Sequence, residues 1–125
     1  MIRARNTFLK MNKAFILIGF AVLVVGCEKI DTPGGTPNCI KNKIEEIAEG
    51  EVWNPPAKIY RYQYNGQTVY YFPSRCCDIP SILYDENCIV ICSPDGGFIG
   101  NGDGRCPDFF SSRTDEKLIW EDLRE

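Results

Sequence analysis

The sequence predicts an α+β fold, in which one N-terminal helix packs on a small antiparallel β-sheet in a disulfide-rich domain. Apolar residues at helical spacing in residues 38–50 predict the helix, and an alternating pattern around Asn-Gly in residues 57–72 predicts a β-hairpin. Six cysteines lie within residues 39–106. An even number of cysteines in a short exported domain is typical of a disulfide framework. We therefore expect residues 38–125 to form a single domain.

The predicted helix begins at Asn38, whose side chain is a good N-cap, and ends at Gly50, which suits a left-handed C-terminal residue. Three isoleucines make one apolar stripe at i, i+4 and i+7: Ile40, Ile44 and Ile47. Lysine and glutamate occupy the other face. The two prolines that follow, in residues 55–56, break the direction of the chain.

Asn65-Gly66 is the preferred two-residue turn of a β-hairpin, and it sets the register of the strands on either side. The expected cross-strand pairs are Tyr64 with Gln67, Tyr62 with Val69, and Tyr60 with Tyr71. One face of the hairpin then carries four tyrosines: Tyr60, Tyr62, Tyr64 and Tyr71. This row is a candidate ligand surface, because each ring joins an apolar face to a polar hydroxyl. The alternative is ordinary cross-strand packing.

The second half of the chain predicts a further hairpin, a loop and a final strand. Residues 81–85 and 88–93 flank a short Glu-Asn turn and form the second hairpin. Residues 94–110 are rich in glycine, which permits a backbone with positive φ, so we expect an ordered loop closed by the last cysteine. The final segment fits either a helix or a closing strand. We favour the strand because of the apolar run 118–120.

Residues 1–26 have the three parts of a lipoprotein signal peptide. Four basic residues come first: Arg3, Arg5, Lys10 and Lys13. The apolar run that follows has twelve residues, fewer than the roughly 20 of a membrane-spanning helix. It ends in VVGC, which resembles the bacterial lipobox. We expect cleavage after Gly26 and acylation of Cys27, with palmitate as a typical chain; an ordinary signal peptide or an uncleaved anchor is the alternative.

The mature chain is expected to be an acidic, lipid-anchored protein of the cell envelope. Removal of residues 1–26 takes away four of the 14 basic residues and none of the 17 acidic ones, which leaves a net charge of 10 − 17 = −7. Such a surface disfavours nucleic acid as a partner. Residues 27–37 contain glycine, proline and threonine and predict a flexible tether. We expect the outer membrane, with the periplasmic or surface face left open.

The six cysteines of the domain are expected to be oxidised to three disulfides: Cys39, Cys76, Cys77, Cys88, Cys92 and Cys106. Zinc binding and thiol redox chemistry are disfavoured, because the chain has no histidine and no C-x-x-C motif. A bond between the adjacent Cys76 and Cys77 would close a strained small ring. Cys88 and Cys92 would stand about 13 Å apart on one strand, beyond the roughly 7 Å limit for a disulfide. The other pairings stay open.

Four oxygen-bearing residues of the glycine-rich loop are weak candidates for a calcium site: Asp95, Asn101, Asp103 and Asp108. The EF-hand pattern is not met, because Ile99 occupies the first ligand position and Phe110 that of the closing glutamate. The alternative is a set of turns in which aspartates accept hydrogen bonds from nearby backbone N–H groups. We therefore predict no metal and no cofactor, and keep a calcium-dependent module as an alternative.

Four motifs resemble those of a family of small bacterial lipoproteins found chiefly in Bacteroidota. The motifs are CCD at 76–78, LYDENC at 83–88, ICSPDGGFIGNGDGRCPDF at 91–109 and LIWED at 118–122. The family is a domain of unknown function, and the likeness covers nearly the whole mature domain. The resemblance implies export and a compact domain with several cysteines. It implies no activity, ligand or catalytic residue.

The leading hypothesis for function is a non-enzymatic binding or interaction module whose partner is an unknown envelope protein or a glycan. Catalysis is not predicted, because the chain lacks histidine, the commonest general base, and has no Gly-Lys-Ser/Thr phosphate loop. A protease or hydrolase inhibitor is the other alternative. In that case the glycine-rich loop would be presented to the enzyme, with Phe98 or Arg105 as the contact residue.

Overall fold

The computed structural model describes residue 19 and residues 30–76 and 78–125. The predicted signal peptide, the predicted lipidation site Cys27 and the disulfide candidate Cys77 lie outside these residues. The described part of the chain contains these elements in order: α1 (Asn38–Glu49), β1 (Lys58–Tyr64), β2 (Gln67–Phe72), β3 (Ile82–Tyr84), β4 (Val90–Cys92), α2 (Phe109–Ser112) and β5 (Thr114–Glu121). No helix in this part is long and apolar enough to cross a membrane.

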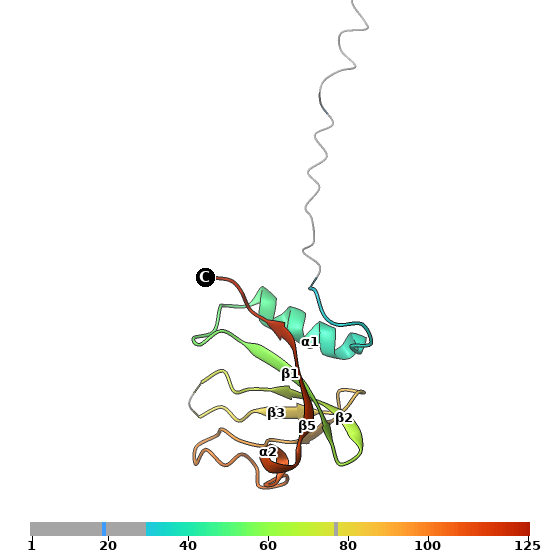
Figure 1. Ribbon diagram of the computed structural model, residues 1–125. Helices are drawn as coiled ribbons and strands as arrows, with labels where there is room; N and C mark the ends of the chain where they lie inside the picture. Colours follow the sequence, from blue (N-terminus) through green and yellow to red (C-terminus); the bar gives the residue numbers. More distant parts are fainter. Residues whose placement is uncertain (1–18, 20–29, 77) are drawn as a thin grey trace, which may run out of the picture.

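The five strands form one antiparallel sheet with the order β4-β3-β2-β1-β5 (Figure 1). The last strand therefore lies beside the first, and β4 and β5 are the two edges. The predicted α+β class, with an N-terminal helix on a small antiparallel sheet, is confirmed. The preference for a C-terminal strand is also confirmed, although the short helix α2 before it was not predicted.

The first hairpin has the predicted register. Tyr60 faces Tyr71, Tyr62 faces Val69, and Tyr64 faces Gln67 across β1 and β2. The turn residues Asn65 and Gly66 have φ of 49° and 76°, as a tight turn that matches the strand twist requires. In the second hairpin, β3 pairs with β4, and the Asp85 carboxylate accepts hydrogen bonds from the backbone N–H groups of Asn87 and Ile89.

Helix α1 has the predicted length but not the predicted ends. Asn38 is its first helical residue, and Pro37 occupies the cap position without a side-chain hydrogen bond. The Pro37 carbonyl accepts hydrogen bonds from Ile40 N–H and Lys41 N–H, and proline has no N–H of its own to satisfy. Gly50 has φ of −85° and is extended, so the predicted left-handed stop is wrong. Ile40 and Ile44 are fully buried, which confirms the apolar stripe.

The two faces of the sheet carry two separate hydrophobic clusters. One lies under α1 and contains these buried residues: Ile40, Ile44, Ile59, Tyr70, Phe72, Tyr84 and Ile119. The other lies under α2 and the loop before it, and contains these: Tyr62, Tyr64, Val69, Tyr71, Leu83, Cys92, Cys106 and Phe109. Alternating side chains of β1 and β2 contribute to both clusters, which is why aromatic residues occur on both faces.

Two disulfides join distant parts of the described chain. Cys39, in the first turn of α1, bonds to Cys88 in the β3–β4 turn. Cys92 at the end of β4 bonds to Cys106. Cys76 is disulfide-bonded as well. Cys88 and Cys92 are not bonded to each other, as predicted, but Cys88 lies in a turn with φ of 60° and not in the expected strand.

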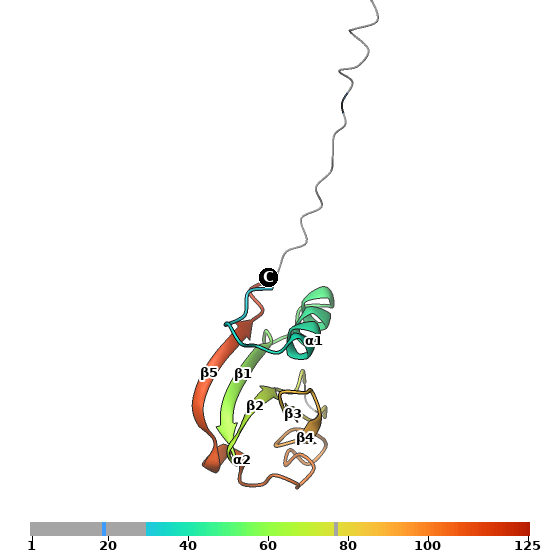
Figure 2. The same cartoon turned by 90° about the vertical axis from the view of Figure 1, so that its right-hand side faces the viewer.

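The chain enters the domain and leaves it at the same end. In both views the segment before α1 and the C-terminal tail lie close together at the top, whereas the loop after β4 and helix α2 lie at the bottom (Figures 1 and 2). Part of the predicted flexible tether is packed: Thr36 is buried, and Ile30 contacts the cluster under α1. Ile30 and Thr36 of the predicted tether are therefore attached to the domain, whereas Asp31, Gly34 and Gly35 are exposed.

Candidate functional site

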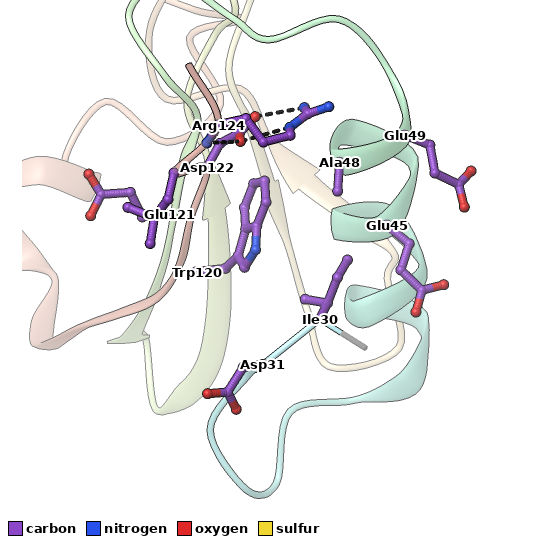
Figure 3. Close-up of a pocket in the computed structure, with 10 residues that line it drawn as sticks. Ile30, Asp31, Glu45, Ala48, Glu49, Trp120, Glu121, Asp122 and Arg124 are labelled. Carbon is purple, nitrogen blue, oxygen red and sulfur yellow. Dashed lines mark hydrogen bonds and ion pairs between the residues drawn. The ribbon is translucent and has the colours of Figure 1, made fainter. Parts of the chain in front are cut away.

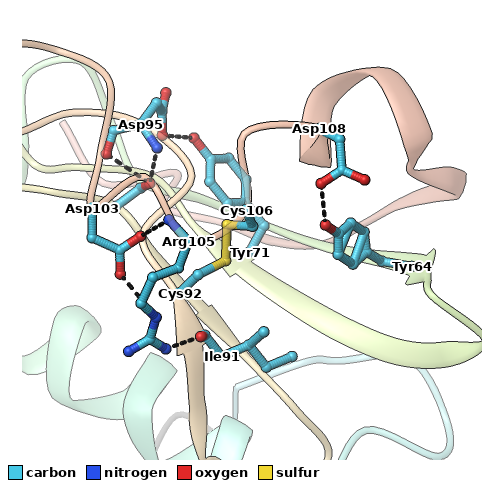
Figure 4. Close-up of a disulfide and its surroundings, with 10 residues drawn as sticks. Tyr64, Tyr71, Ile91, Cys92, Asp95, Asp103, Arg105, Cys106 and Asp108 are labelled. Carbon is cyan, nitrogen blue, oxygen red and sulfur yellow. Dashed lines mark hydrogen bonds and ion pairs between the residues drawn. A yellow bond between two sulfur atoms is a disulfide. The ribbon is translucent and has the colours of Figure 1, made fainter.

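The loop that connects β4 to α2, residues 93–108, is the most distinctive surface feature of the domain. The Cys92–Cys106 disulfide closes its base with a Cα–Cα distance of 6.1 Å (Figure 4). The two cysteines are 14 residues apart, and a ring of this size stabilises the fold by about 3 kcal/mol in the chain-entropy model. The disulfide limits the conformations that the loop can adopt.

Backbone hydrogen bonds fix the inside of the loop. Gly96 N–H donates to Gly100 O over 3.3 Å, and Gly102 N–H donates to Gly96 O over 3.0 Å. Asp103 N–H donates to Ser93 O over 3.0 Å. These bonds need glycine at two positions: a Cβ on Gly96 would meet Ile79 O at 2.6 Å, and one on Gly102 would clash with the backbone of residues 93–95. Both glycines also have positive φ, so the loop is ordered, as the sequence predicted.

Ser81 and Tyr71 attach the loop to the sheet. Ser81 is fully buried, and its N–H and hydroxyl both donate to Asp95 O over 3.0 Å. Asp95 N–H lies 3.1 Å from the Ser81 hydroxyl oxygen, which accepts from it. The Tyr71 hydroxyl donates to Asp95 Oδ1 over 2.7 Å (Figure 4). Asp95 is therefore the residue through which the hydrophobic core positions the loop.

The tip of the loop displays two adjacent apolar side chains. Phe98 is 91% exposed and Ile99 is 82% exposed, between Gly97 and Gly100. Scattered exposed apolar residues are normal, but two neighbours this exposed in an ordered loop are unusual. Sequence reasoning identified Phe98 as a contact residue, whereas it gave Ile99 only a place in a failed calcium pattern. Ser81 was missed, since a single serine before a strand carries no distinctive signal.

The four tyrosines proposed as a ligand surface do not form one. Tyr62, Tyr64 and Tyr71 are buried, and only Tyr60 is partly exposed. The rings of the three buried tyrosines surround Phe109 of α2, with centroid distances of 5.3 to 5.6 Å. The alternative of cross-strand packing is therefore correct. The sequence could not show this, because α2 covers the face and was itself not predicted.

The three buried tyrosines of this cluster each donate a hydrogen bond from the hydroxyl to a carboxylate. Tyr62 donates to Glu116 over 2.6 Å, Tyr64 donates to Asp108 over 2.6 Å, and Tyr71 to Asp95. Burial raises the pKa of Tyr62 and Tyr71 well above 10, and the hydrogen bond to the carboxylate adds to this. The same kind of bond, from Tyr64, lowers the pKa of Asp108. These tyrosines remain protonated donors at neutral pH and hold the covering segment in place.

The weak calcium candidates are engaged separately in protein contacts. Asp95 and Asp108 accept from the tyrosine hydroxyls, and Asp103 accepts from Arg105 N–H over 3.0 Å, which lowers the pKa of Asp103. Asn101 is exposed. Within residues 30–76 and 78–125, no group of three or more His, Cys, Asp or Glu side chains is placed to hold a metal ion. The geometry thus favours the alternative of aspartates that stabilise turns.

Arg105 is held against the sheet edge and is not presented at the loop tip. Its guanidinium donates to Ile91 O on β4 and lies 3.4 Å from the Asp103 carboxylate (Figure 4). The carbonyl that it covers belongs to an edge strand, where open backbone groups attract other strands. Both contact residues predicted for an inhibitor are exposed, but the Arg105 guanidinium is engaged with Ile91 O and Asp103, whereas Phe98 stands at the loop tip.

Fold and site together define a small, disulfide-stabilised α+β domain with a rigid, apolar-tipped loop. A family model described as "Domain of unknown function (DUF6970)" matches residues 45–122 of the chain. The match covers more than half of the chain, which therefore belongs to this family. It includes the whole sheet, both disulfide-bonded residues of the loop and the loop tip. Comparisons with curated proteins and with solved structures found no match.

Proposed function

We propose that this protein is a bacterial envelope lipoprotein, as the resemblance to Bacteroidota lipoproteins implies, and that its domain is a non-enzymatic binding module. The observation that carries the binding role is the pair Phe98 and Ile99, 91% and 82% exposed at the tip of a braced loop. Water solvates these side chains poorly, so a partner that covers them gains hydrophobic free energy.

The rigidity of the loop supports the same role. A contact loop that is already ordered loses little conformational entropy on binding, and this improves affinity. Here the disulfide, the glycine hydrogen bonds and the Asp95 attachment all order the loop before any partner arrives. A loop that served only to connect β4 to α2 would not need so many constraints around a solvent-exposed apolar tip.

The position of the loop suits an anchored protein. The loop and the chain entry lie at opposite ends of the domain (Figure 2). If Cys27 carries the lipid, the entry faces the membrane and the loop points away from it. The partner is then an envelope protein or glycan beyond the anchoring membrane surface. The chain lacks histidine, and the loop carboxylates are already paired, so the site offers binding contacts and no evident general base.

Site-specific photocrosslinking in intact envelopes tests the binding role. A benzophenone amino acid is placed at Phe98 and, as a matched control, at Ile89, which is 62% exposed in the β3–β4 turn. We expect a defined adduct from position 98 and none from position 89. The double variant Phe98→Ser/Ile99→Ser should lower affinity for the captured partner at least about tenfold, as loss of a central apolar contact does. No adduct at position 98, or equal adducts at both positions, contradicts the proposal.

A second candidate is an inhibitor of an envelope protease or hydrolase. The observation that favours it is the same braced loop, which would present Phe98 to the specificity pocket of an enzyme. Arg105 is not the contact residue in this version, because its guanidinium is bound to Ile91 O. A panel of envelope proteases assayed with wild-type protein and with Phe98→Ser separates this candidate from a passive binding module. Unchanged enzyme activity with wild-type protein excludes it.

A further inference from the structure

A groove lies between the second half of α1 and the end of β5, beside the point where the chain enters the domain (Figure 3). Its volume is about 700 Å³, within the range of small-molecule sites. Four apolar side chains line it: Ile30, Ala48, Trp120 and Leu123. We call this feature the entry groove. It belongs neither to the loop nor to the tyrosine cluster described above.

The inside of the entry groove is apolar, although its rim is charged. Trp120 and Ala48 face each other across it, and Ile30 lies at one end (Figure 3). Glu45 and Glu49 point away from the groove, as the same view shows. The charged pair at its other end is satisfied internally, because Asp122 binds Arg124. An uncharged, elongated apolar group therefore fits the groove better than a cation does.

Several hydrogen bonds fix the Asp122–Arg124 pair at that end of the groove. Arg124 donates from Nε and Nη2 to the Asp122 carboxylate over 2.9 and 2.8 Å. The same guanidinium donates to Gly50 O over 2.9 Å and to Ile47 O over 3.2 Å. It therefore ties the C-terminal tail to the last turn of α1. The two walls of the entry groove are fixed relative to each other, so the groove exists before any occupant binds.

The chain itself carries a matching group close by. Cys27 precedes Ile30 by three residues, a span of at most about 11 Å of extended chain. One acyl chain spans one leaflet of a bilayer core, about 15 Å. The other mature residues before Ile30 are Glu28 and Lys29, which are polar. Of residues 27–29, only an acylated Cys27 thus brings an apolar group to this place.

We infer that the entry groove binds one acyl chain of Cys27 while the protein is in water, so that the domain shields part of its own lipid. This inference rests on the proposed lipidation. The anchoring of several acyl chains in a membrane outweighs the binding of one chain in a groove. The bound state therefore belongs to the protein in transit between membranes, and the groove empties when the lipid enters a bilayer.

Fluorescence quenching of Trp120 tests the inference on the full lipidated chain. Cells that express Trp53→Phe are fed either a brominated fatty acid or its ordinary counterpart, so that Trp120 is the only tryptophan and the lipid carries the quencher. The mass of the purified protein first establishes whether Cys27 is acylated. In buffer without detergent, we expect the brominated chain to abolish most of the Trp120 fluorescence. The matched variant Trp120→Phe, which retains Trp53, should keep its fluorescence.

Two further variants separate binding in the groove from mere proximity. Ala48→Glu places a charge inside the groove at a half-buried helix position, and should restore most of the Trp120 fluorescence. Glu45→Gln, on the same helix but pointing away, should leave the quenching unchanged. Unquenched Trp120 in acylated protein overturns the groove inference but leaves the lipid anchor intact. Quenching that disappears on dilution has the same meaning, because the acyl chain then comes from a second molecule. An unmodified Cys27 overturns the lipoprotein proposal and the inference with it.

Discussion

The Tyr71 hydroxyl donates a hydrogen bond of 2.7 Å to Asp95 Oδ1, and so joins the hydrophobic core to the first residues of the exposed loop. Tyr71 lies on β2, and Asp95 lies 24 residues later in the chain. The contact connects the β1–β2 hairpin with the loop that carries the candidate binding surface. Its loss should therefore affect both stability and the order of the loop.

Tyr71→Phe tests this connection. The variant keeps the ring and removes the donor, so the charged Asp95 carboxylate loses one hydrogen bond, at a cost of about 2 kcal/mol. Urea unfolding should show a lower free energy of unfolding, and loop amides should exchange faster with solvent. Tyr60→Phe is the matched control, since the Tyr60 hydroxyl has no hydrogen bond within the described part of the chain. Equal losses in both variants would contradict the role of Asp95.

Removal of one disulfide should mainly lower the free energy of unfolding, and removal of the other should mainly speed hydrogen exchange in the loop. The Cys39–Cys88 bond spans 49 residues and the Cys92–Cys106 bond spans 14, so the chain-entropy model assigns them about 4 and about 3 kcal/mol. Serine replacement of the first pair should lower the free energy of unfolding more. Replacement of the second pair should have the larger effect on hydrogen exchange within the loop. Identical exchange in the two variants would show that the loop is ordered without its disulfide.

The lowered pKa of Asp122 predicts that the protein becomes less stable in acid. The Asp122 side chain is 1% exposed, and hydrogen bonds from Arg124 lower its pKa in the folded protein. A lowered folded pKa means that this stabilisation is present above the unfolded pKa of about 3.9, and that it is lost as the pH falls toward the folded pKa. Asp122→Asn should therefore reduce stability at pH 7 by about 2 kcal/mol and flatten the loss of stability below pH 4.

Thermal unfolding from pH 7 to pH 2 measures this effect. Asp78→Asn is the control, because Asp78 is exposed. Parallel pH profiles for wild type and Asp122→Asn would mean that other carboxylates cause the acid sensitivity. The variant should also loosen the C-terminal tail from α1, since Asp122 orients the guanidinium of Arg124.

Alanine substitutions at two loop glycines distinguish the cost of backbone strain from the cost of a steric clash. Gly102 and Gly104 have φ of +66° and +74°, so alanine at either position costs about 1 kcal/mol through the backbone alone. A Cβ on Gly104 meets nothing within 4 Å, whereas a Cβ on Gly102 meets the backbone of Ser93 and Asp95. Gly102→Ala should thus destabilise the domain clearly more than Gly104→Ala in urea unfolding. Equal effects would mean that the loop has room to shift.

Local sequence signals predicted the parts of the fold that depend on near neighbours. Asn65-Gly66 determines its own turn, and the turn determines the register of β1 and β2. The spacing of Ile40 and Ile44 likewise predicted α1, because the stripe arises within one helix. The N-cap prediction was wrong because the helix begins after Pro37, whose carbonyl accepts from Ile40 N–H and Lys41 N–H, so Asn38 is already helical.

The candidate site was less accessible to sequence reasoning, because it depends on contacts between distant residues. Ser81 and Asp95 are 14 residues apart, and neither residue type predicts the other. The burial of Tyr62 and Tyr64 depends on Phe109, in a helix of four residues that is too short to show a period. The glycine content of the loop predicted an ordered backbone, but could not show that the tip would leave Phe98 and Ile99 uncovered.

The pairing of β5 with β1 has a consequence for how the protein is made. These strands are separated by most of the domain, and Arg124 adds a tie from the tail to α1. A nascent chain that has emerged only as far as α2 therefore has an open β1 edge and cannot complete its sheet. Proteases and misaligned strands have access to that edge until β5 has been made and has paired with β1, so correct folding of the sheet waits for this last strand.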